Sequence, residues 1–373
     1  MTNTKRALAL LNYEKYDRLP IVHFGYWGET LKKWHSEGHI TAEEWHGWRD
    51  GENQAERSIN SKLGWDFNWY NCFGPRTFMY PTFESKIVKT FPDGSSHTLN
   101  SYGVIELNKP GAGSIHAEID HTLKDRESWE RDYKFRFQFS EDRIPYEALA
   151  QIKKTQDDRD IPLGIHAGSL LGNIRNVVGM LGVAYIYADD EELFREIIDT
   201  VGSLCYEVTK KTLETGVKFD FGHFWEDICF KNGPLINPSV FDELIGPWYK
   251  KITGLMNEHG IKIVSLDCDG LIDSLIPTWI NNGVNTMFPI EVGTWNANIA
   301  PWREKYGKEL RGVGGMNKNV FSQDRAAIDA EIERLKPLIA LGGYIPCPDH
   351  RIAPDAVWEN VQYYCEKLRN LKT

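Results

Sequence analysis

Short β-rich runs alternate with long amphipathic segments over the second half of the chain, and this alternation narrows the available folds more than any other feature. Amphipathic segments such as 190–216 and 326–343 have apolar residues three and four positions apart, as expected of surface helices. The β-rich runs between such segments cover residues 161–168, 218–225, 261–267, 285–291, 309–315 and 342–347. Strand–helix alternation of this kind predicts a parallel sheet covered by helices.

Two earlier strand candidates, residues 18–27 and 65–73, bring the six runs to eight, the number in a (β/α)8 TIM barrel. The 373 residues show no low complexity, internal repeat or Pro/Ser-rich linker, which favours one domain over residues 1–373. Residues 83–123 interrupt the strand–helix alternation, because apolar and polar residues alternate there around the turn sequence Pro92-Asp93-Gly94. This pattern predicts a β-hairpin inserted near the mouth of the barrel.

Charge and cysteine content exclude several classes of protein. A formal net charge of −10 without a Lys/Arg run argues against nucleic acid as a partner. No segment approaches the roughly 20 apolar residues of a membrane span, and the first residues lack a cleavage-site pattern, so we expect a cytoplasmic protein. The six cysteines lack C-x-x-C spacing, which indicates neither a disulfide scaffold nor a zinc ribbon.

Ionisable residues recur where the predicted strands end, the position of active sites in TIM barrels. Helix capping could explain any single one of them. It explains less well why five strands each end in such a residue. The candidates are His166, His223, Glu226, Asp227, Asp267, Asp269, Glu291, Lys318, Asp349 and His350. His23, Tyr26 and Trp27, at the end of the first strand, are expected to line the substrate pocket.

Two alternative metal sites can be drawn from these residues. A carboxylate and two thiolates, those of Glu226, Cys268 and Cys347, would suit zinc. The harder set combines Glu226 and His350 with Asp267 or Asp269 and is less selective for zinc. Asp267 and Asp269 face one way in an extended chain and Cys268 faces the other, so only one of the two sites can form.

Four stretches resemble the uroporphyrinogen decarboxylase superfamily, and the resemblance covers nearly the whole chain. They are "WEDICFKNGPLINPSVFDELIGPWYKKI", "DCDGLIDSLIPTWINNGVNTMFPIE", "GGMNKNVF" and "GGYIPCPDHRIAPDAVWENVQYY". The resemblance implies a single TIM barrel with one of two chemistries. These are cofactor-free decarboxylation and zinc-dependent methyl transfer to or from a corrinoid protein.

Departures from the family patterns favour methyl transfer. Family decarboxylases grip substrate carboxylates with an arginine in a Pro-Val-x-x-x-Arg-type stretch, where "RLPIVHFGYWGE" has Gly25. "PDGSSHTLNSYG" resembles the branch rich in O-demethylase-type methyltransferases. Thiol-methylating members hold zinc with His-x-Cys and a final Cys, positions that match Asp267, Asp269 and His350 here. Carboxylate and imidazole leave zinc more Lewis acidic than thiolates do, which suits the polarisation of an ether oxygen.

The resemblance thus implies transfer of a methyl group from a small donor, such as a methoxylated aromatic, to the cobalt of a separate corrinoid protein. Glu226, Asp269 and His350 would be catalytic and hold zinc, while His166, His223 and Glu291 would contact the substrate. The alternative is a cofactor-free decarboxylase in which an Asp stabilises a protonated substrate and His350 handles the proton. A non-catalytic binding protein is a third reading, and a homodimer is compatible with the sequence.

Overall fold

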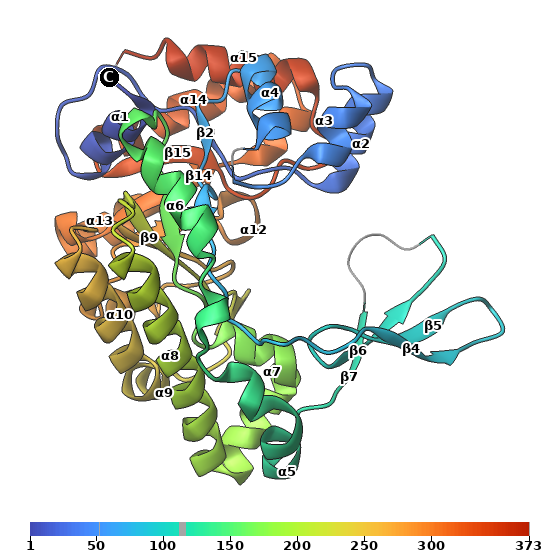
Figure 1. Cartoon of the computed structure of the whole chain (residues 1–373). Helices are drawn as coiled ribbons and strands as arrows, with labels where there is room; N and C mark the ends of the chain where they lie inside the picture. The colour runs from blue at the N-terminus through green and yellow to red at the C-terminus, as the bar shows by residue number, and fades with distance from the viewer. Residues whose placement is uncertain (52, 112–116, 373) are drawn as a thin grey trace.

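A parallel sheet of seven strands forms the centre of the molecule, in the order β15-β14-β13-β12-β9-β8-β3 (Figure 1). This computed structural model describes residues 1–51, 53–111 and 117–372. Every neighbouring pair in the sheet is parallel. The strands are β3 (Cys72–Phe73), β8 (Gly164–His166), β9 (Phe221–Trp225), β12 (Val264–Asp267), β13 (Thr286–Phe288), β14 (Arg311–Met316) and β15 (Tyr344–Pro348).

A further parallel pair, β1 (Val22–His23) and β2 (Phe67–Asn68), lies beside this sheet. The chain that leaves β15 is joined to the chain that leaves β1, because Ile352 N donates to Gly25 O at 3.0 Å and Trp27 N donates to Ile352 O at 3.2 Å. All eight predicted runs contain a strand, and residues 65–73 contain both β2 and β3. The mixed α/β fold with a parallel sheet is therefore confirmed, while closure into a barrel and the single domain stay predictions.

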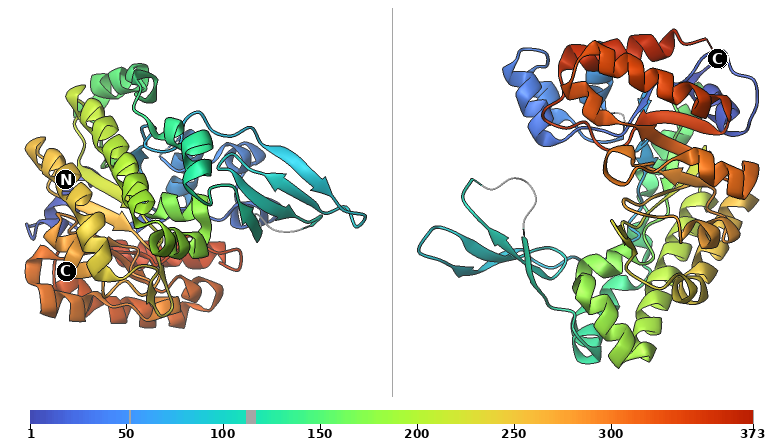
Figure 2. Two further views of the ribbon diagram at one scale, coloured as in Figure 1. Left: turned by 90° about the horizontal axis from the view of Figure 1, so that it is seen from below. Right: turned by 180° about the vertical axis from the view of Figure 1, so that it is seen from behind.

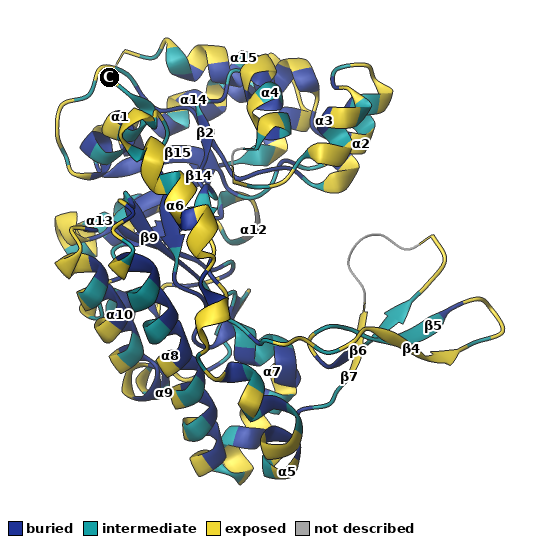
Figure 3. Ribbon diagram, viewed as in Figure 1, coloured by how far each residue is buried: buried dark blue, intermediate teal, exposed yellow. Residues whose placement is uncertain are grey.

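Amphipathic helices pack around the sheet (Figures 1 and 2). In α8, buried Leu193, Ile197 and Val201 recur every fourth residue, and the opposite side is exposed (Figure 3). Among the described residues, no helix combines the length and apolar character needed to cross a membrane. The helices are α1 (Asn3–Leu11), α2 (Gly28–Ser36), α3 (Ala42–Gly47), α4 (Gln54–Leu63), α5 (Arg126–Ser128), α6 (Tyr146–Thr155), α7 (Gly172–Asp189), α8 (Glu191–Glu214), α9 (Pro238–Leu244), α10 (Gly246–Glu258), α11 (Ile276–Asn281), α12 (Val292–Trp295), α13 (Ile299–Tyr306), α14 (Arg325–Ala340) and α15 (Trp358–Arg369).

A four-stranded antiparallel sheet, here called the arm, stands away from the rest of the molecule (Figures 1 and 2). The hairpin expected around Pro92-Asp93-Gly94 corresponds to its first two strands, and two further strands extend it. Residues 112–116 of the predicted insertion lie outside the described residues. The arm consists of β4 (Lys86–Thr90), β5 (Ser96–Leu99), β6 (Val104–Asn108) and β7 (Ala117–His121).

Candidate functional site

Asp269 and His350 meet where the chain leaves β12 and β15. His350 Nε2 lies 3.4 Å from Asp269 Oδ2. The other polar atoms of the pair, Asp269 Oδ1 and His350 Nδ1, are buried and have no hydrogen-bond partner among the described residues. Leaving a buried polar atom unpaired costs about 1–3 kcal/mol. Two such atoms on facing residues therefore mark a place where a polar ligand would be stabilised.

Aromatic rings surround this pair. The indole of Trp27 stacks on the His350 imidazole, with ring centroids 5.6 Å apart and an interplanar angle of 17°. Phe24 presents its edge to His350 at 5.4 Å and stacks on Tyr70 at 5.3 Å, while Phe288 lies 4.5 Å from Phe24. Flat apolar surfaces of this kind suit an aromatic ligand. Trp27 was predicted to line the pocket. Phe24, Tyr70 and Phe288 were not, because their sequence positions are those of ordinary strand residues.

The surroundings of Asp267, the last residue of β12, favour the neutral, protonated form of its carboxyl group. The side chain is buried, and the Tyr70 hydroxyl donates a hydrogen bond to Asp267 Oδ2. Burial above all, followed by the nearby charge of Asp269, raises the pKa of Asp267 well above its usual value. A carboxyl group that favours its protonated form in this way can itself donate a hydrogen bond.

Glu291 joins the turn after β12 to the end of β13. Glu291 Oε2 accepts hydrogen bonds from Gly270 N, at 2.8 Å, and from Trp295 Nε1. Burial first, and then the charge of Asp269, raise the pKa of Glu291 to about 7. The protonation of Glu291 therefore changes near neutral pH.

This pKa predicts a pH-dependent stability difference between the wild type and Glu291→Gln. Below about pH 4.5, Glu291 is protonated in both the folded and the unfolded state. Between about 4.5 and 7 only the folded state keeps the proton, so this residue's contribution to stability falls as pH rises through that window. We expect Glu291→Gln to gain about 3 kcal/mol over the wild type between pH 4.5 and 8. Urea unfolding of both proteins at each pH checks this, and parallel pH profiles would contradict it.

Glu226, a predicted catalytic residue and metal ligand, binds the backbone at the start of α7 instead. The Glu226 carboxylate accepts hydrogen bonds from the backbone N–H groups of residues 170–172, at 2.5 to 2.9 Å. The hydroxyls of Ser169 and Tyr249 also donate to it. A Cβ at Gly172 would lie 1.9 Å from Glu226 O, so only glycine allows this approach. Five donors occupy this carboxylate, which corrects the expectation that it faces the strand-end site.

Asp227, the second carboxylate expected at the end of β9, is influenced electrostatically by the Asp269–His350 pair. It adopts a positive φ of 50°, and its carboxylate contacts Arg175 Nη2 at 3.3 Å. Burial first, and then Asp269, raise the pKa of Asp227, and the charge of His350 acts in the opposite direction. Asp227 thus joins Asp267 and Glu291 as a carboxyl group whose pKa is raised in part by the charge of Asp269.

Neither of the two predicted zinc sites is assembled. Cys268 is buried, and its Sγ accepts from Ile228 N at 3.4 Å. Cys347 is fully buried between Pro346 and Pro348. Within the described ranges, no three His, Cys, Asp or Glu side chains are placed to hold one metal ion. Zinc requires at least three protein ligands, and Asp269 and His350 supply two, so the residues as arranged do not fit a zinc site.

Of the remaining predicted residues, His166 and His223 lie side by side on β8 and β9. Their rings are 5.4 Å apart, and His223 Nδ1 lies 2.7 Å from Ser265 Oγ. His223 Nε2 is buried without a partner in the described chain, and burial lowers the pKa of both histidines.

His23, at the end of β1, is likewise buried, and its pKa is lowered to about 3 by burial and then by Arg351. Tyr26 is buried and donates to Asn60 Oδ1 at 3.1 Å, so it belongs to the core.

Arg351 fills the space beside Gly25, where the family pattern has an arginine. A Cβ on Gly25 would lie 2.6 Å from Arg351 Nη1 and 2.8 Å from Asp50 Oδ1. Arg351 Nη2 forms an ion pair with Asp50 Oδ2 at 2.7 Å. A guanidinium thus occupies the region of the missing arginine, with a carboxylate of the same chain as its counter-ion.

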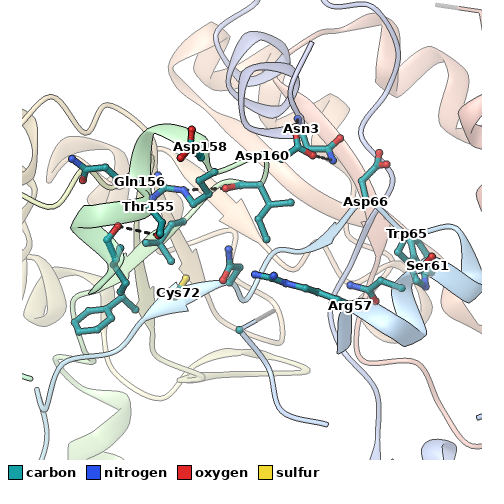
Figure 4. Close-up of a pocket in the computed structure, with 18 residues that line it drawn as sticks. Asn3, Arg57, Ser61, Trp65, Asp66, Cys72, Thr155, Gln156, Asp158 and Asp160 are labelled. Carbon is teal, nitrogen blue, oxygen red and sulfur yellow. Dashed lines mark hydrogen bonds between the residues drawn. The ribbon is translucent and has the colours of Figure 1, made fainter. Parts of the chain in front are cut away.

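A separate cavity of about 930 Å³ lies toward the amino-terminal ends of β2 and β8 (Figure 4). Its lining includes Arg57, Asn60, Trp65, Cys72, Thr155 and Arg159. It also includes Asp66 and Asp160, which stand just before strands rather than after them. This cavity is therefore distinct from the strand-end site of Asp269 and His350.

Comparisons with known proteins identify the fold. No protein-family model matches the sequence, and no curated protein matches it. The structure is similar to that of a methyltransferase from Methanosarcina mazei, with a TM-score of 0.62 and 15% identity over 99% of this chain and 98% of that chain. A Listeria monocytogenes protein assigned as a vitamin-B12-independent methionine synthase gives a TM-score of 0.43 and 12% identity over 95% of this chain and 98% of that chain. The chain therefore has the same fold as the Methanosarcina mazei methyltransferase.

Proposed function

We propose that this protein is a methyltransferase that moves a methyl group from a methoxylated aromatic compound to the cobalt of a corrinoid on a separate protein. The observation that carries the proposal is the facing pair Asp269 and His350, each with a buried unpaired polar atom, beside the rings of Phe24, Trp27 and Tyr70. The rings suit the aromatic part of the donor, and the pair suits its ether oxygen. The fold shared with a methyltransferase supports the same reading.

In the proposed reaction, the C–O bond of the methyl ether breaks and both of its electrons stay on oxygen. The methyl carbon forms its new bond to the reduced corrinoid cobalt, and the oxygen takes one proton to give a phenol. We assign that proton to Nδ1 of a protonated His350, because Nε2 faces Asp269 and Nδ1 has no partner among the described residues. Asp269 then fixes the orientation of the imidazole ring.

Because the residues present do not fit zinc, the proposed reaction uses only side chains of this protein and the partner's corrinoid. Proton donation by His350 would meet the same need, stabilisation of charge on the departing oxygen. Metal analysis of the purified protein checks whether zinc is bound. Less than about 0.1 zinc per chain after dialysis is expected, since two donors hold zinc weakly. One zinc per chain, lost in His350→Ala, would show that a third ligand moves into place.

The proposed activity can be tested by mixing the protein anaerobically with cob(I)alamin, as a substitute for the partner's corrinoid, and a panel of methoxylated aromatics. We expect methylcob(III)alamin and the matching phenol to form in equal amounts with at least one donor. A matched series of donors lacking the methoxy group serves as the control. No methyl transfer from any donor, with the corrinoid kept reduced throughout, would contradict the proposal.

The guanidinium beside Gly25 supports one alternative, a decarboxylase acting on a carboxylated substrate. Arg351 could bind a substrate carboxylate if it exchanged its contact with Asp50. The existing ion pair makes this alternative the weaker one, because the charge of Arg351 is already matched. Release of carbon dioxide from a carboxylated aromatic without corrinoid, abolished in Arg351→Gln, would favour it over methyl transfer.

A further inference from the structure

One face of the arm is mainly apolar and basic, and the other is mainly polar, although the exposed side chain of Ile87 lies on it. The strand register places Leu99 opposite Ile105, and His97 opposite Leu107, on a single face. All four are partly exposed. Thr98 and Glu106 form a pair on the opposite face. The arm stands clear of the helices and the central sheet, so within the described residues no second layer packs on its apolar face (Figure 1).

A second exposed apolar surface runs along α7. Met180, Leu181 and Tyr185 are 48%, 68% and 62% exposed, values that belong to solvent-facing positions. Ala184 and Ala188 are exposed on the same helix, at the four-residue spacing that extends this stripe. Val183 and Ile186 face the core, so this part of α7 is apolar on both sides. Helices that are apolar all round are normally buried.

The arm contacts α7 at its base through the face opposite to Ile105 and Leu107. The imidazole of His121, the last residue of β7, packs on Gly179, where an added Cβ would lie 2.6 Å from the ring. His121 pairs with Val104, the neighbour of Ile105, and therefore points away from the apolar face. The apolar face of the arm and the α7 stripe are thus two separate exposed surfaces of the chain.

The charges at the two surfaces are complementary. Lys86 and Lys89 lie opposite Leu99 and His97 on β4, which puts both lysines on the apolar face of the arm. Asp120, opposite Ile105, lies on the same face, but its charge is paired with Lys124 at 2.9 Å. The end of α7 carries Asp189, and Glu192 follows at the start of α8. Neither acidic residue has a hydrogen-bond or ion-pair partner among the described residues, and both are exposed. A basic apolar face and an acidic apolar stripe would attract one another.

We propose that two copies of this chain form a two-fold symmetric dimer in which the apolar face of each arm covers the α7 stripe of the other copy. Both complementary surfaces occur on every chain, so one two-fold axis satisfies all four of them at once. The β4 edge of the arm is a poor alternative contact. Its edge strand β4 carries two lysines and a bulge between Ile87 and Lys89, features that oppose edge-to-edge pairing.

The mass of the purified full-length protein in solution tests this dimer. Light scattering is expected to give twice the chain mass of 42.9 kDa at micromolar concentration. Leu107→Glu on the arm face and Leu181→Glu on α7 should each shift the mass to that of one chain. Thr98→Glu on the opposite face of the arm is the matched control and should remain a dimer. Far-UV circular dichroism of each variant verifies that it is folded.

Exchanging charged residues between the two surfaces tests the dimer even if an apolar variant fails to fold. Lys89→Glu is an exposed change that should raise the dimer dissociation constant at least about tenfold, and adding Glu192→Lys to the same chain should restore part of the affinity. A monomeric wild type would overturn the proposal and leave the surface to a partner of another kind. A dimer that resists Leu107→Glu, Leu181→Glu and Lys89→Glu alike would overturn it equally.

Discussion

His350→Ala and Asp269→Asn are each expected to lower the rate of methyl transfer about 10²- to 10⁴-fold, the usual range for loss of a general acid or of the group that orients it. His350 supplies the proton in the proposed reaction, and Asp269 faces its Nε2 at 3.4 Å. The measurement is the single-turnover rate with saturating donor.

Two control variants separate this chemistry from general damage. Asp355→Asn removes an exposed carboxylate from the same segment after β15 and should leave the rate within about twofold. Cys347→Ser alters a fully buried thiol that belongs to the rejected zinc set, and it should lower stability rather than the rate constant. A large rate loss in folded Cys347→Ser, with little effect of His350→Ala, would favour the thiolate site over the Asp269–His350 pair.

Glu226→Ala is expected to destabilise the fold by about 3–5 kcal/mol, which is at the upper end of the cost of a single substitution. Removal of the carboxylate leaves three buried N–H groups at the start of α7 without acceptors, together with the hydroxyls of Ser169 and Tyr249. Glu226→Gln should also be costly, because its amide N–H₂ would face N–H donors. Urea denaturation of the purified variants measures the loss.

Asp227→Asn provides the matched control for Glu226→Ala. Asparagine tolerates the positive φ of this position, and the half-exposed ion pair with Arg175 contributes little. The cost should stay below about 1 kcal/mol. Equal stabilities of the wild type and Glu226→Ala, combined with lost activity, would mean that Glu226 serves the reaction and not the start of α7.

The arrangement of the sheet follows closely from the sequence, because each strand carries its own local signal. Every predicted β-rich run contains a strand, and segments 190–216 and 326–343 contain α8 and most of α14. The two later arm strands were not predicted. The turn before β6, Asn100-Ser101-Tyr102-Gly103 with a positive φ at Gly103, was not used as a strand boundary, and β7, with the sequence AEIDH, has little strand propensity.

The part of the candidate site that depends only on strand topology could be predicted from the sequence. Asp269 and His350 follow parallel strands of one sheet, and the carboxyl ends of parallel strands share an edge, so the two could be expected to meet. The roles of Glu226 and Asp227 could not be inferred in this way. The backbone N–H groups of residues 170–172, more than 50 positions away, determine which of the two adjacent carboxylates is bound at the start of α7.

The same limit applies to the cysteines and to Arg351. Cys347 is the middle residue of Pro346-Cys347-Pro348, and its burial depends on how the outer helices pack around β15. Arg351 reaches the space beside Gly25 from the opposite end of the chain. Contacts of this length have no periodic or spacing signal in one sequence, so only the folded structure reveals them.

A crystal structure of the protein with a methoxylated aromatic donor, or with the corresponding phenol, would show directly whether the Asp269–His350 pair binds the donor. We expect the ring beside Phe24, Trp27 and Tyr70, with its oxygen within about 3.2 Å of His350 Nδ1. Ligand bound in the cavity of about 930 Å³ instead, or a His350 imidazole turned away from a ligand at the strand ends, would contradict the proposed role of this pair.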